Sequence, residues 1–485
     1  MDTVLTFLSN HLGLIMLVVL PIAIPLILFQ VLPLLVLMER RGASFIQDRI
    51  GPNRAGINLS AKALGALTLK RDAIAGIFAH ERDGQPTLRL RAFGMLFNMA
   101  DLVKILFKEH FIAPFAERAF YLWAPMIPVA IALFSTALIP WFAPFVHRAA
   151  DGSLVTIVGQ AIDAHSGLLA LFAVGSLGVY GVVLGSWASN SKYSLLGGMR
   201  ASAMMISYEV SMGLSVLGLL LIYGTFSLSG GVAWQEANTW GIVVQPIGFL
   251  LFLIAMFAET NRNPFDVAEG ESEIVAGFHT EFNGIRFMLF MTAEYFHVML
   301  ASVLVAVLFL GGWSILPVPG FGSDWVRDNL GVVLGVGLAG MGLLLLGFAW
   351  LVSRRRAHYA RLAASDRELR LREYGVYAAV FGGAGLAHLV GAVAAILLLD
   401  PEPLERTIAG APVFATWVNL LTAVVQFKIV LVKALAICWL FVWVRWTLPR
   451  FRYDQIMGLG WKVLLNIALI NLLATAVIAK LVQEL

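Results

Sequence analysis

The sequence predicts an all-α fold, a polytopic membrane helix bundle of about ten spans. Of its 485 residues, 59% are hydrophobic and only 13% are charged, whereas a soluble domain carries roughly 25% charged residues. The charges are also unevenly spread. The stretches 12–38 and 119–146 contain no Asp, Glu, Lys or Arg, and about 18 apolar residues suffice to cross a bilayer as a helix. These observations predict a single membrane domain over 1–485.

Hydropathy places the ten expected spans in order along the chain, and the basic residues orient them. Most of the 34 Lys and Arg residues lie in five connecting segments, and basic residues concentrate on the cytoplasmic side of membrane proteins. We therefore expect these segments to be cytoplasmic and the N-terminus to lie outside. The segments are 39–118, 190–200, 259–286, 353–374 and 445–460. The spans are 12–38, 119–146, 166–189, 201–223, 241–258, 287–313, 329–352, 375–399, 413–444 and 461–479.

The first cytoplasmic loop, 39–118, contains two features of its own. Residues 98–111 (NMADLVKILFKEHF) are too charged to cross a bilayer. Leu102, Ile105 and Leu106 still form an apolar stripe, so we expect an amphipathic helix at the membrane surface. Further upstream, the tight-turn pair Asp83-Gly84 precedes the alternating residues 87–93. This pattern predicts a β-hairpin.

The segment 259–286 is acidic although the other cytoplasmic segments are basic. A solvated loop would explain the charge alone, but this segment is also rich in Phe, Ile, Val and Gly, which favours burial. Clustered carboxylates in a poorly solvated place raise one another's proton affinity, which suits a proton relay. Its carboxylates are Glu259, Asp266, Glu269, Glu271, Glu273 and Glu281, against Arg262 and Arg286.

Apart from Lys462 at the edge of the last span, four charged residues fall inside expected spans. Glu209 and Glu294 would each cost about 2.5–3.5 kcal/mol as ions at bilayer depth, so each should be neutral, paired or beside water. A structural hydrogen bond to a neighbouring helix is the simpler alternative to a role in proton transfer. We expect Lys428 and Lys433 to extend to the membrane edge or to pair with one of these glutamates.

Several kinds of site are excluded or disfavoured. The single cysteine, Cys438, excludes a disulfide framework, a cysteine-ligated iron–sulfur cluster and a structural zinc site on this chain. Residues 335–340 (GVGLAG) match the dinucleotide-binding pattern, but they lie within an apolar span without a preceding strand. We expect no metal, flavin or nucleotide on this chain and no nucleic-acid partner, because basic residues here report topology.

The loop sequences resemble one family. Residues 258–277 (AETNRNPFDVAEGESEIVAG) form the longest and most specific match. Residues 39–54 (ERRGASFIQDRIGPNR), 100–109 (ADLVKILFKE), 185–198 (GSWASNSKYSLLGG) and 444–462 (VRWTLPRFRYDQIMGLGWK) also match, in the family's order. The chain resembles the membrane subunit called H in bacteria and 1 in mitochondria of respiratory complex I, the proton-pumping NADH:quinone oxidoreductase. Residues 58–93 and the two-helix segment 325–412 look inserted relative to the eight-span family pattern. His279 and His297 stand where asparagine is common.

The resemblance implies an enzyme subunit that is not catalytic alone and carries no redox centre. It implies a quinone, ubiquinone or menaquinone, as bound substrate in a chamber shared with the hydrophilic iron–sulfur and quinone-module subunits. It also implies membrane-arm subunits and membrane lipid as partners, in the inner (plasma) membrane of a bacterium. The implied quinone-chamber residues are Glu39, Arg40, Gln47, Arg49, Asp101 and Arg262. The implied proton-relay residues are Glu209, Glu269, Glu271, Glu273 and Glu294, assisted by Asp266 and Glu281.

Two alternatives stay open at this stage. The same membrane module occurs in ferredoxin-, F420H2- and hydrogenase-linked complexes, which differ in electron input. A stand-alone ion transporter would also use intramembrane Glu and Lys. Such transporters commonly contain internal repeats, and none is visible in this sequence.

Overall fold

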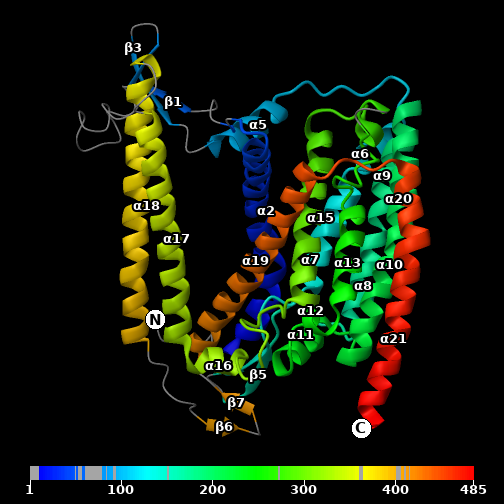
Figure 1. The fold of residues 1–485 in the computed structure, drawn as a ribbon, viewed down its shortest axis with the longest axis vertical. Coiled ribbons are helices and arrows are strands. Elements are labelled where there is room, and N and C mark those ends of the chain that lie inside the picture. The colour runs from blue at the N-terminus through cyan, green and yellow to red at the C-terminus, as the bar shows by residue number, and fades with distance from the viewer. Residues whose placement is uncertain are drawn as a thin grey trace. The chain divides into compact units, whose positions relative to one another are not determined.

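Helices make up most of the structure (Figure 1). The computed structural model describes residues 10–49, 51–52, 57–60, 79–82, 85–90, 94–149, 152–270, 274–359, 364–399, 406–408, 411–413 and 415–484. The chain divides into two compact units. The first comprises Met1–Arg49, Asp101–Trp325 and Glu405–Leu485, and the second Ile50–Ala100 and Val326–Leu404.

The long helices of the first unit run side by side, with α19 crossing obliquely (Figure 1). α10 packs on α9, α13 and α21, whereas α15 packs on α2, α7 and α19. The helices are α2 (Leu12–Ile46), α6 (Arg118–Trp123), α7 (Met126–Leu138), α8 (Gly167–Ser176), α9 (Gly178–Ala188), α10 (Lys192–Tyr223), α11 (Leu228–Ala237), α12 (Gly241–Val244), α13 (Pro246–Glu259), η2 (Gly277–His279), α15 (Gly284–Phe309), α19 (Thr416–Thr447), α20 (Tyr453–Gly458), the π-helical turn η3 (Leu459–Leu464) and α21 (Leu465–Glu484).

Small residues set the closest helix approaches in this unit. A Cβ on Gly198 of α10 would overlap Ser186 Oγ of α9, so glycine is needed there. α10 ends where Gly224 adopts a left-handed backbone, φ 67°, a conformation that glycine takes without steric cost. In α2 the prolines Pro21, Pro25 and Pro33 lie inside the helix, which membrane helices tolerate when neighbouring groups satisfy the freed carbonyls.

The expected all-helical membrane bundle is confirmed. Among the described residues, nine helical segments are long and apolar enough to cross a membrane, by length and composition. The helix of the second expected span ends at Leu138, earlier than the expected residue 146. Beyond it lie Pro140 and the strand β4 (Phe145–Arg148), which pairs with β5 (Leu154–Ile157). The strands β6 (Arg406–Ile408) and β7 (Ala411–Val413) form a further hairpin.

The fifth expected span, 241–258, is broken into α12 and α13. Pro246 has no N–H to donate to the preceding turn, and α13 begins at this residue with 14 residues, about 21 Å. Gln245, buried at the break, donates to Thr475 Oγ1 at 2.5 Å and accepts from Asn471 Nδ2 at 3.0 Å. Both partners lie on α21, so α21 satisfies the polar side chain at this break.

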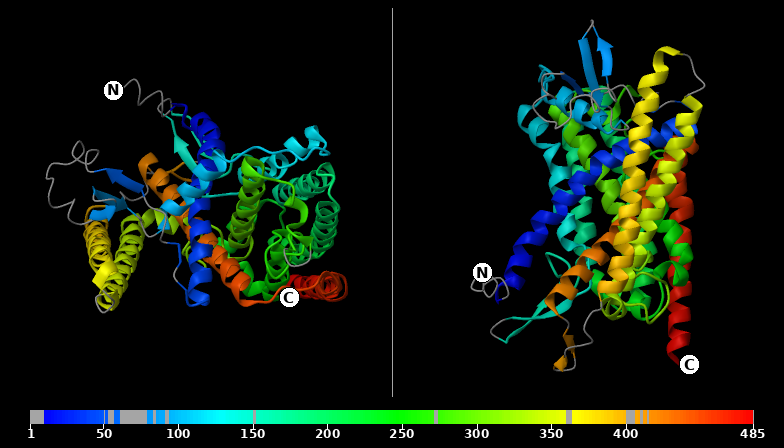
Figure 2. Two further views of the ribbon diagram at one scale, coloured as in Figure 1. Left: turned by 90° about the horizontal axis from the view of Figure 1, so that it is seen from above. Right: turned by 90° about the vertical axis from the view of Figure 1, so that its left-hand side faces the viewer.

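The second unit contains two long helices, α17 (Leu330–Tyr359) and α18 (Ala364–Leu398), and the short helix α16 (Ser323–Asp328) precedes them. The two long helices run antiparallel and side by side (Figures 1 and 2). Gly342 and Gly385 let the helix backbones approach, because a Cβ on either would lie 2.9 Å from the other's carbonyl oxygen. Small residues bring membrane helices together in this way.

The expected hairpin in the segment 58–93 is confirmed. Strand β3 (Gln85–Leu90) pairs with β1 (Ile57–Ser60) and β2 (Ala79–Arg82) in an antiparallel sheet of order β1-β3-β2. Arg82 pairs with Gln85, so the hairpin closes around positions 83 and 84, which lie outside the described residues.

The amphipathic helix expected at 98–111 is α5 (Leu96–Leu106). Its apolar residues Met99, Leu102, Val103 and Leu106 are 38–61% exposed in the chain by itself.

Candidate functional site

A chain of alternating charges joins α2, α15, α19 and the segment after α13. Glu39 of α2 lies between two guanidinium groups, with Arg445 Nη1 at 2.5 Å and Arg262 Nη1 at 3.5 Å. The Nε atom of Arg262 also lies 3.1 Å from Glu294 Oε1 of α15. Two carboxylates face two guanidinium groups, so ion pairing offsets part of the cost of taking these groups out of water.

The backbone conformation after α13 directs the side chain of Arg262 into this cluster. Asn261 adopts a left-handed conformation, φ 50°, which asparagine tolerates better than most residues. Arg262 then lies over the ring of Tyr295, 4.3 Å from its centre, and the Tyr295 hydroxyl donates to Glu39 Oε2 at 2.7 Å. Burial by itself would lower the pKa of Arg262, but the carboxylates of Glu294 and Glu39 raise it above its ordinary value.

Arg262 is only 5% exposed, yet it does not use all of its donors. Its Nε and Nη2 atoms are buried without a hydrogen-bond partner in the described part of the chain. The contact with Glu294 is therefore an ion pair without a well-aligned hydrogen bond. A cavity of about 20 Å³ adjoins Glu39, Arg262, Tyr295 and Arg445, which is room for about one water molecule.

The segment after α19 is tied to the acidic segment. Arg450 Nη2 lies 2.7 Å from Asp266 Oδ2, and Asp266 is 7% exposed. The side-chain amide of Asn263 donates to the carbonyl oxygens of Arg445 and Leu448, at 2.7 and 3.0 Å. The expected burial of the acidic segment is therefore found for Asp266, whose charge is paired.

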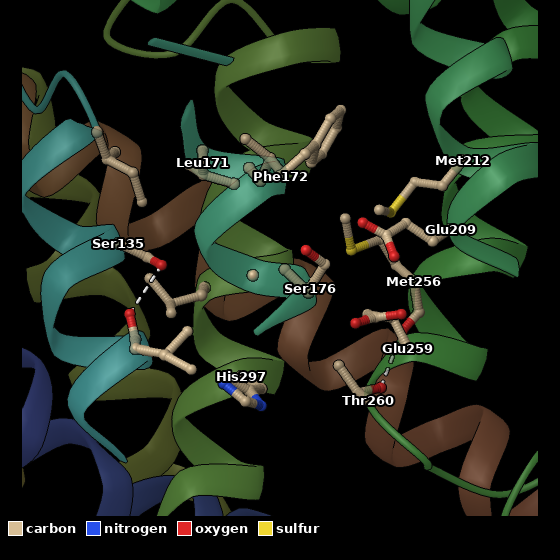
Figure 3. A pocket seen from close by; sticks show the side chains of 16 residues that line it. Ser135, Leu171, Phe172, Ser176, Glu209, Met212, Met256, Glu259, Thr260 and His297 are labelled. Carbon is tan, nitrogen blue, oxygen red and sulfur yellow. Dashed lines mark hydrogen bonds between the residues drawn. The ribbon is translucent and has the colours of Figure 1, made fainter. Parts of the chain in front are cut away.

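A second cavity collects titratable side chains from three helices (Figure 3). It measures about 80 Å³ and is lined by Glu209 of α10, Glu259 of α13 and His297 of α15. Glu209 and Glu259 are close enough for their charges to interact. Glu259 Oε2 is buried without a hydrogen-bond partner among the described residues. The remaining wall is mostly apolar, with the hydroxyl groups of Ser135, Ser176 and Thr260.

The other quinone-side candidates form two exposed pairs. Arg40 Nη2 lies 2.8 Å from Asp101 Oδ2, and their side chains are 40% and 35% exposed. Arg49 Nε donates to Gln47 Oε1 at 2.6 Å. The six quinone-side candidates are thus separated, with Glu39 and Arg262 buried and the other four at the surface.

The remaining relay candidates are only partly described. The negative charge of Glu269 acts on Arg262. The backbone carbonyl of Glu281 accepts from the Tyr121 hydroxyl at 2.7 Å. Glu271 and Glu273 lie outside the described residues.

Further along the acidic segment, His279 is buried between aromatic rings. The rings of Phe278 and Phe287 lie 4.9 and 5.2 Å from its own. Its Nδ1 atom has no hydrogen-bond partner in the part of the chain described here. Burial lowers the pKa of His279 to about 4, so this imidazole is neutral at pH 7.

The structure adds four residues to the quinone-chamber and proton-relay candidates that the resemblance implied. Tyr295 and Arg445 contact Glu39 directly, while Glu259 and His297 line the second cavity. Glu259 was visible as a carboxylate at the end of a span and Tyr295 as the neighbour of Glu294, but no local signal pointed to Arg445.

Of the two alternatives expected for Lys433, pairing with a glutamate is wrong. Lys433 pairs with neither Glu209 nor Glu294. Its ammonium donates to the carbonyl oxygens of Leu310 and Gly312, at 2.6 and 3.0 Å, and to that of Ser314 at 2.5 Å. These carbonyls follow the end of α15, where helix carbonyls lack partners within the helix.

Metal ligation has no candidate in the described ranges, where no group of three or more His, Cys, Asp or Glu side chains could hold an ion.

Comparisons with known proteins show the family of this chain. The NADH dehydrogenase family model matches residues 17–364 and 375–476. The chain is 37% identical over 405 residues to an H-type subunit of NADH-quinone oxidoreductase from Solibacter usitatus, covering 82% of this chain and 89% of that protein. It is 33% identical over 479 residues to the H-type subunit of NADH-quinone oxidoreductase from Bdellovibrio bacteriovorus, covering 94% of each. The chain therefore belongs to the NADH dehydrogenase family that includes the H-type subunits of NADH-quinone oxidoreductase, respiratory complex I.

Proposed function

We propose that this chain forms part of the quinone chamber of a bacterial proton-translocating NADH:quinone oxidoreductase and contains the start of its proton route. The chain itself holds no redox centre, and electrons reach the quinone from a neighbouring iron–sulfur subunit. The observation that carries the proposal is the charge chain of Arg445, Glu39, Arg262 and Glu294, with a carboxylate-lined cavity adjoining the same helix, α15.

The charge chain suits a site that responds to quinone chemistry. Reduction of a quinone to a quinol consumes two electrons and two protons. A charge change near Arg262 alters its attraction to Glu39 and Glu294, because charges interact strongly where water is scarce. Glu294 has no other ion-pair partner among the described residues, so its proton affinity depends on the position of Arg262. Electron arrival at the quinone thereby becomes coupled to proton uptake at Glu294.

The quinone ring itself binds outside the cavity beside Glu39, which holds only about one water molecule. The exposed pairs Arg40–Asp101 and Gln47–Arg49 offer donors and acceptors to a ring carbonyl or to a partner chain. The hydrophilic quinone-module subunits supply the rest of the chamber wall.

Protons pass from Glu294 towards the cavity of Glu209 and Glu259, and from there to the membrane-arm subunits. We expect water in this cavity to connect the two carboxylates, because the cavity has room for about three water molecules and the buried Glu259 Oε2 atom has no hydrogen-bond partner among the described residues. The remaining carboxylates of the acidic segment, Asp266, Glu269, Glu271, Glu273 and Glu281, assist by exchanging protons with the chamber.

The test is isosteric replacement of the carboxylates in the assembled complex. Gln keeps the shape of Glu but cannot exchange a proton. Glu→Gln at two or more of the five principal relay sites should leave the complex assembled and its clusters reducible by NADH. Quinone reduction and proton pumping should fall together in reconstituted vesicles. The sites are Glu209, Glu269, Glu271, Glu273 and Glu294, and Glu259 forms a sixth test.

Asp454→Asn is the matched control, because this carboxylate is at the surface with a side chain 71% exposed. Normal reduction and normal pumping in all of the glutamine variants would refute the relay. Arg262→Ala should act first on quinone binding and raise the KM for quinone.

The electron input of this chain's complex is part of the proposal. Both relatives compared above are named as subunits of NADH-quinone oxidoreductase, which supports NADH over ferredoxin, F420H2 or hydrogen as the source. Purification with native partners tests this, since NADH-binding and iron–sulfur chains should copurify. A hydrogenase or ferredoxin-linked partner would indicate the homologous complexes, and a lone oligomer would indicate a transporter.

A further inference from the structure

His297 lines the second cavity and lies on the same helix as Glu294 of the charge chain. It follows Glu294 on α15 by three residues, and residues at this spacing are neighbours on one side of a helix. Glu294 belongs to the ion pair with Arg262, while His297 lines the cavity with Glu209 and Glu259. Figure 3 shows the side chains of Glu209, Glu259 and His297 gathered around the same space.

The imidazole has the hydrogen-bonding capacity that a relay requires. A neutral imidazole has one nitrogen that donates and one that accepts a hydrogen bond. The His297 side chain lines the cavity, and its Cε1 atom would lie 3.8 Å from a Cβ added at Gly178. Glu259 Oε2, in the same cavity, is buried without a hydrogen-bond partner in the described part of the chain. Buried polar atoms are normally satisfied, so water in this cavity of about 80 Å³ is expected to connect them.

We propose that His297 carries protons between the Glu294 site and the carboxylates of the second cavity. The neutral imidazole accepts a proton on one nitrogen from water or a carboxyl group on the Glu294 side. It releases the proton of its other nitrogen to cavity water on the Glu259 side. Exchange of the remaining proton between the nitrogens, through the same water, restores the starting tautomer. No electron or co-reactant is required. The inference rests on the function proposed above.

A packing role is the competing explanation, because the ring also fills space beside α9. The two explanations differ in whether a diffusible imidazole can replace the side chain. A small cavity left by alanine would accept imidazole, and free imidazole restores proton transfer but not a packed helix interface.

The experiment uses the whole complex in reconstituted vesicles with the variants His297→Ala and His297→Asn. Quinone reduction and proton pumping should both fall by about tenfold, since positioned proton-transfer groups contribute ~100-fold or more and water here offers a slower bypass. NADH oxidation by an artificial electron acceptor should be unchanged. Added imidazole should raise both rates several-fold in His297→Ala and leave both rates of wild type unchanged.

His165→Asn is the matched control, because this histidine is exposed and does not line the cavity. It should leave both activities close to wild type. Two results overturn the inference: full activity of both histidine variants, or a loss in His297→Ala that imidazole does not relieve. If Glu209→Gln and Glu259→Gln lose activity while the histidine variants do not, the inference fails but the proposed function stands. Full activity of all of the carboxylate variants would refute the function itself.

Discussion

His279 should make the folded subunit sensitive to acid. Burial lowers the pKa of His279 from 6.5 to about 4, so the unfolded chain binds the proton more readily than the folded chain. The resulting stability is fully present above about pH 6.5 and is lost as the pH falls towards 4. Each pKa unit corresponds to about 1.4 kcal/mol, which gives about 3 kcal/mol over the whole window. Roughly 2 kcal/mol of this should be lost between pH 7 and pH 5.

The measurement compares thermal unfolding of the purified complex at pH 7 and pH 5, followed by tryptophan fluorescence. His279→Asn removes the titrating group, so the variant should lose less stability on acidification than wild type. The difference between the two pH dependences should approach 2 kcal/mol. Other acid-sensitive groups contribute equally to both proteins and cancel. His165→Asn, at an exposed position, should behave as wild type. An unchanged pH dependence in His279→Asn would show that this imidazole is not buried in its neutral form.

Three further predictions concern single contacts. Lys433→Met should destabilise the complex by about 2–4 kcal/mol in the same thermal assay, because three carbonyl oxygens lose their donor. Lys428 is exposed on the same helix, so Lys428→Met should have little effect. Gly198→Ala should cost about 1–3 kcal/mol by forcing α10 away from Ser186, and Gly213→Ala, with open space at its Cβ, should not. Tyr295→Phe removes the donor to Glu39 and should weaken quinone reduction without blocking assembly. Unchanged kinetics would contradict a role for this hydroxyl.

The features that the sequence predicted correctly are local ones. The spans follow from stretches of apolar residues, and the hairpin at β2 and β3 follows from one turn pair and a short alternation. The span 241–258 was predicted, but its break at Pro246 was not. Whether the helix breaks there depends on which residues form hydrogen bonds with the buried side chain of Gln245, and these lie on α21. The family resemblance supplied Glu39 and Arg262 as candidates without saying that they touch.

The features that could not be predicted depend on contacts across the chain. Arg445 forms an ion pair with Glu39 although the two residues lie near opposite ends of the sequence. No pattern in either segment predicts this pairing. For Lys433 the pairing alternative was wrong because the only hydrogen-bond partners that it considered were carboxylates. Backbone carbonyls at the end of a helix lack partners within the helix and accept hydrogen bonds, but the side-chain sequence does not show where they lie.

The polar contact at the break of the fifth span also determines how α21 fits. Apolar side chains distinguish poorly between a neighbouring helix and lipid, so they do not by themselves fix the vertical position of a membrane helix. Asn471 and Thr475, one turn apart on α21, both engage the single amide of Gln245. A slip of one helical turn would move them by about 5.4 Å, beyond hydrogen-bonding reach. The hydrogen bonds among these three residues therefore fix the axial position of α21 relative to α13.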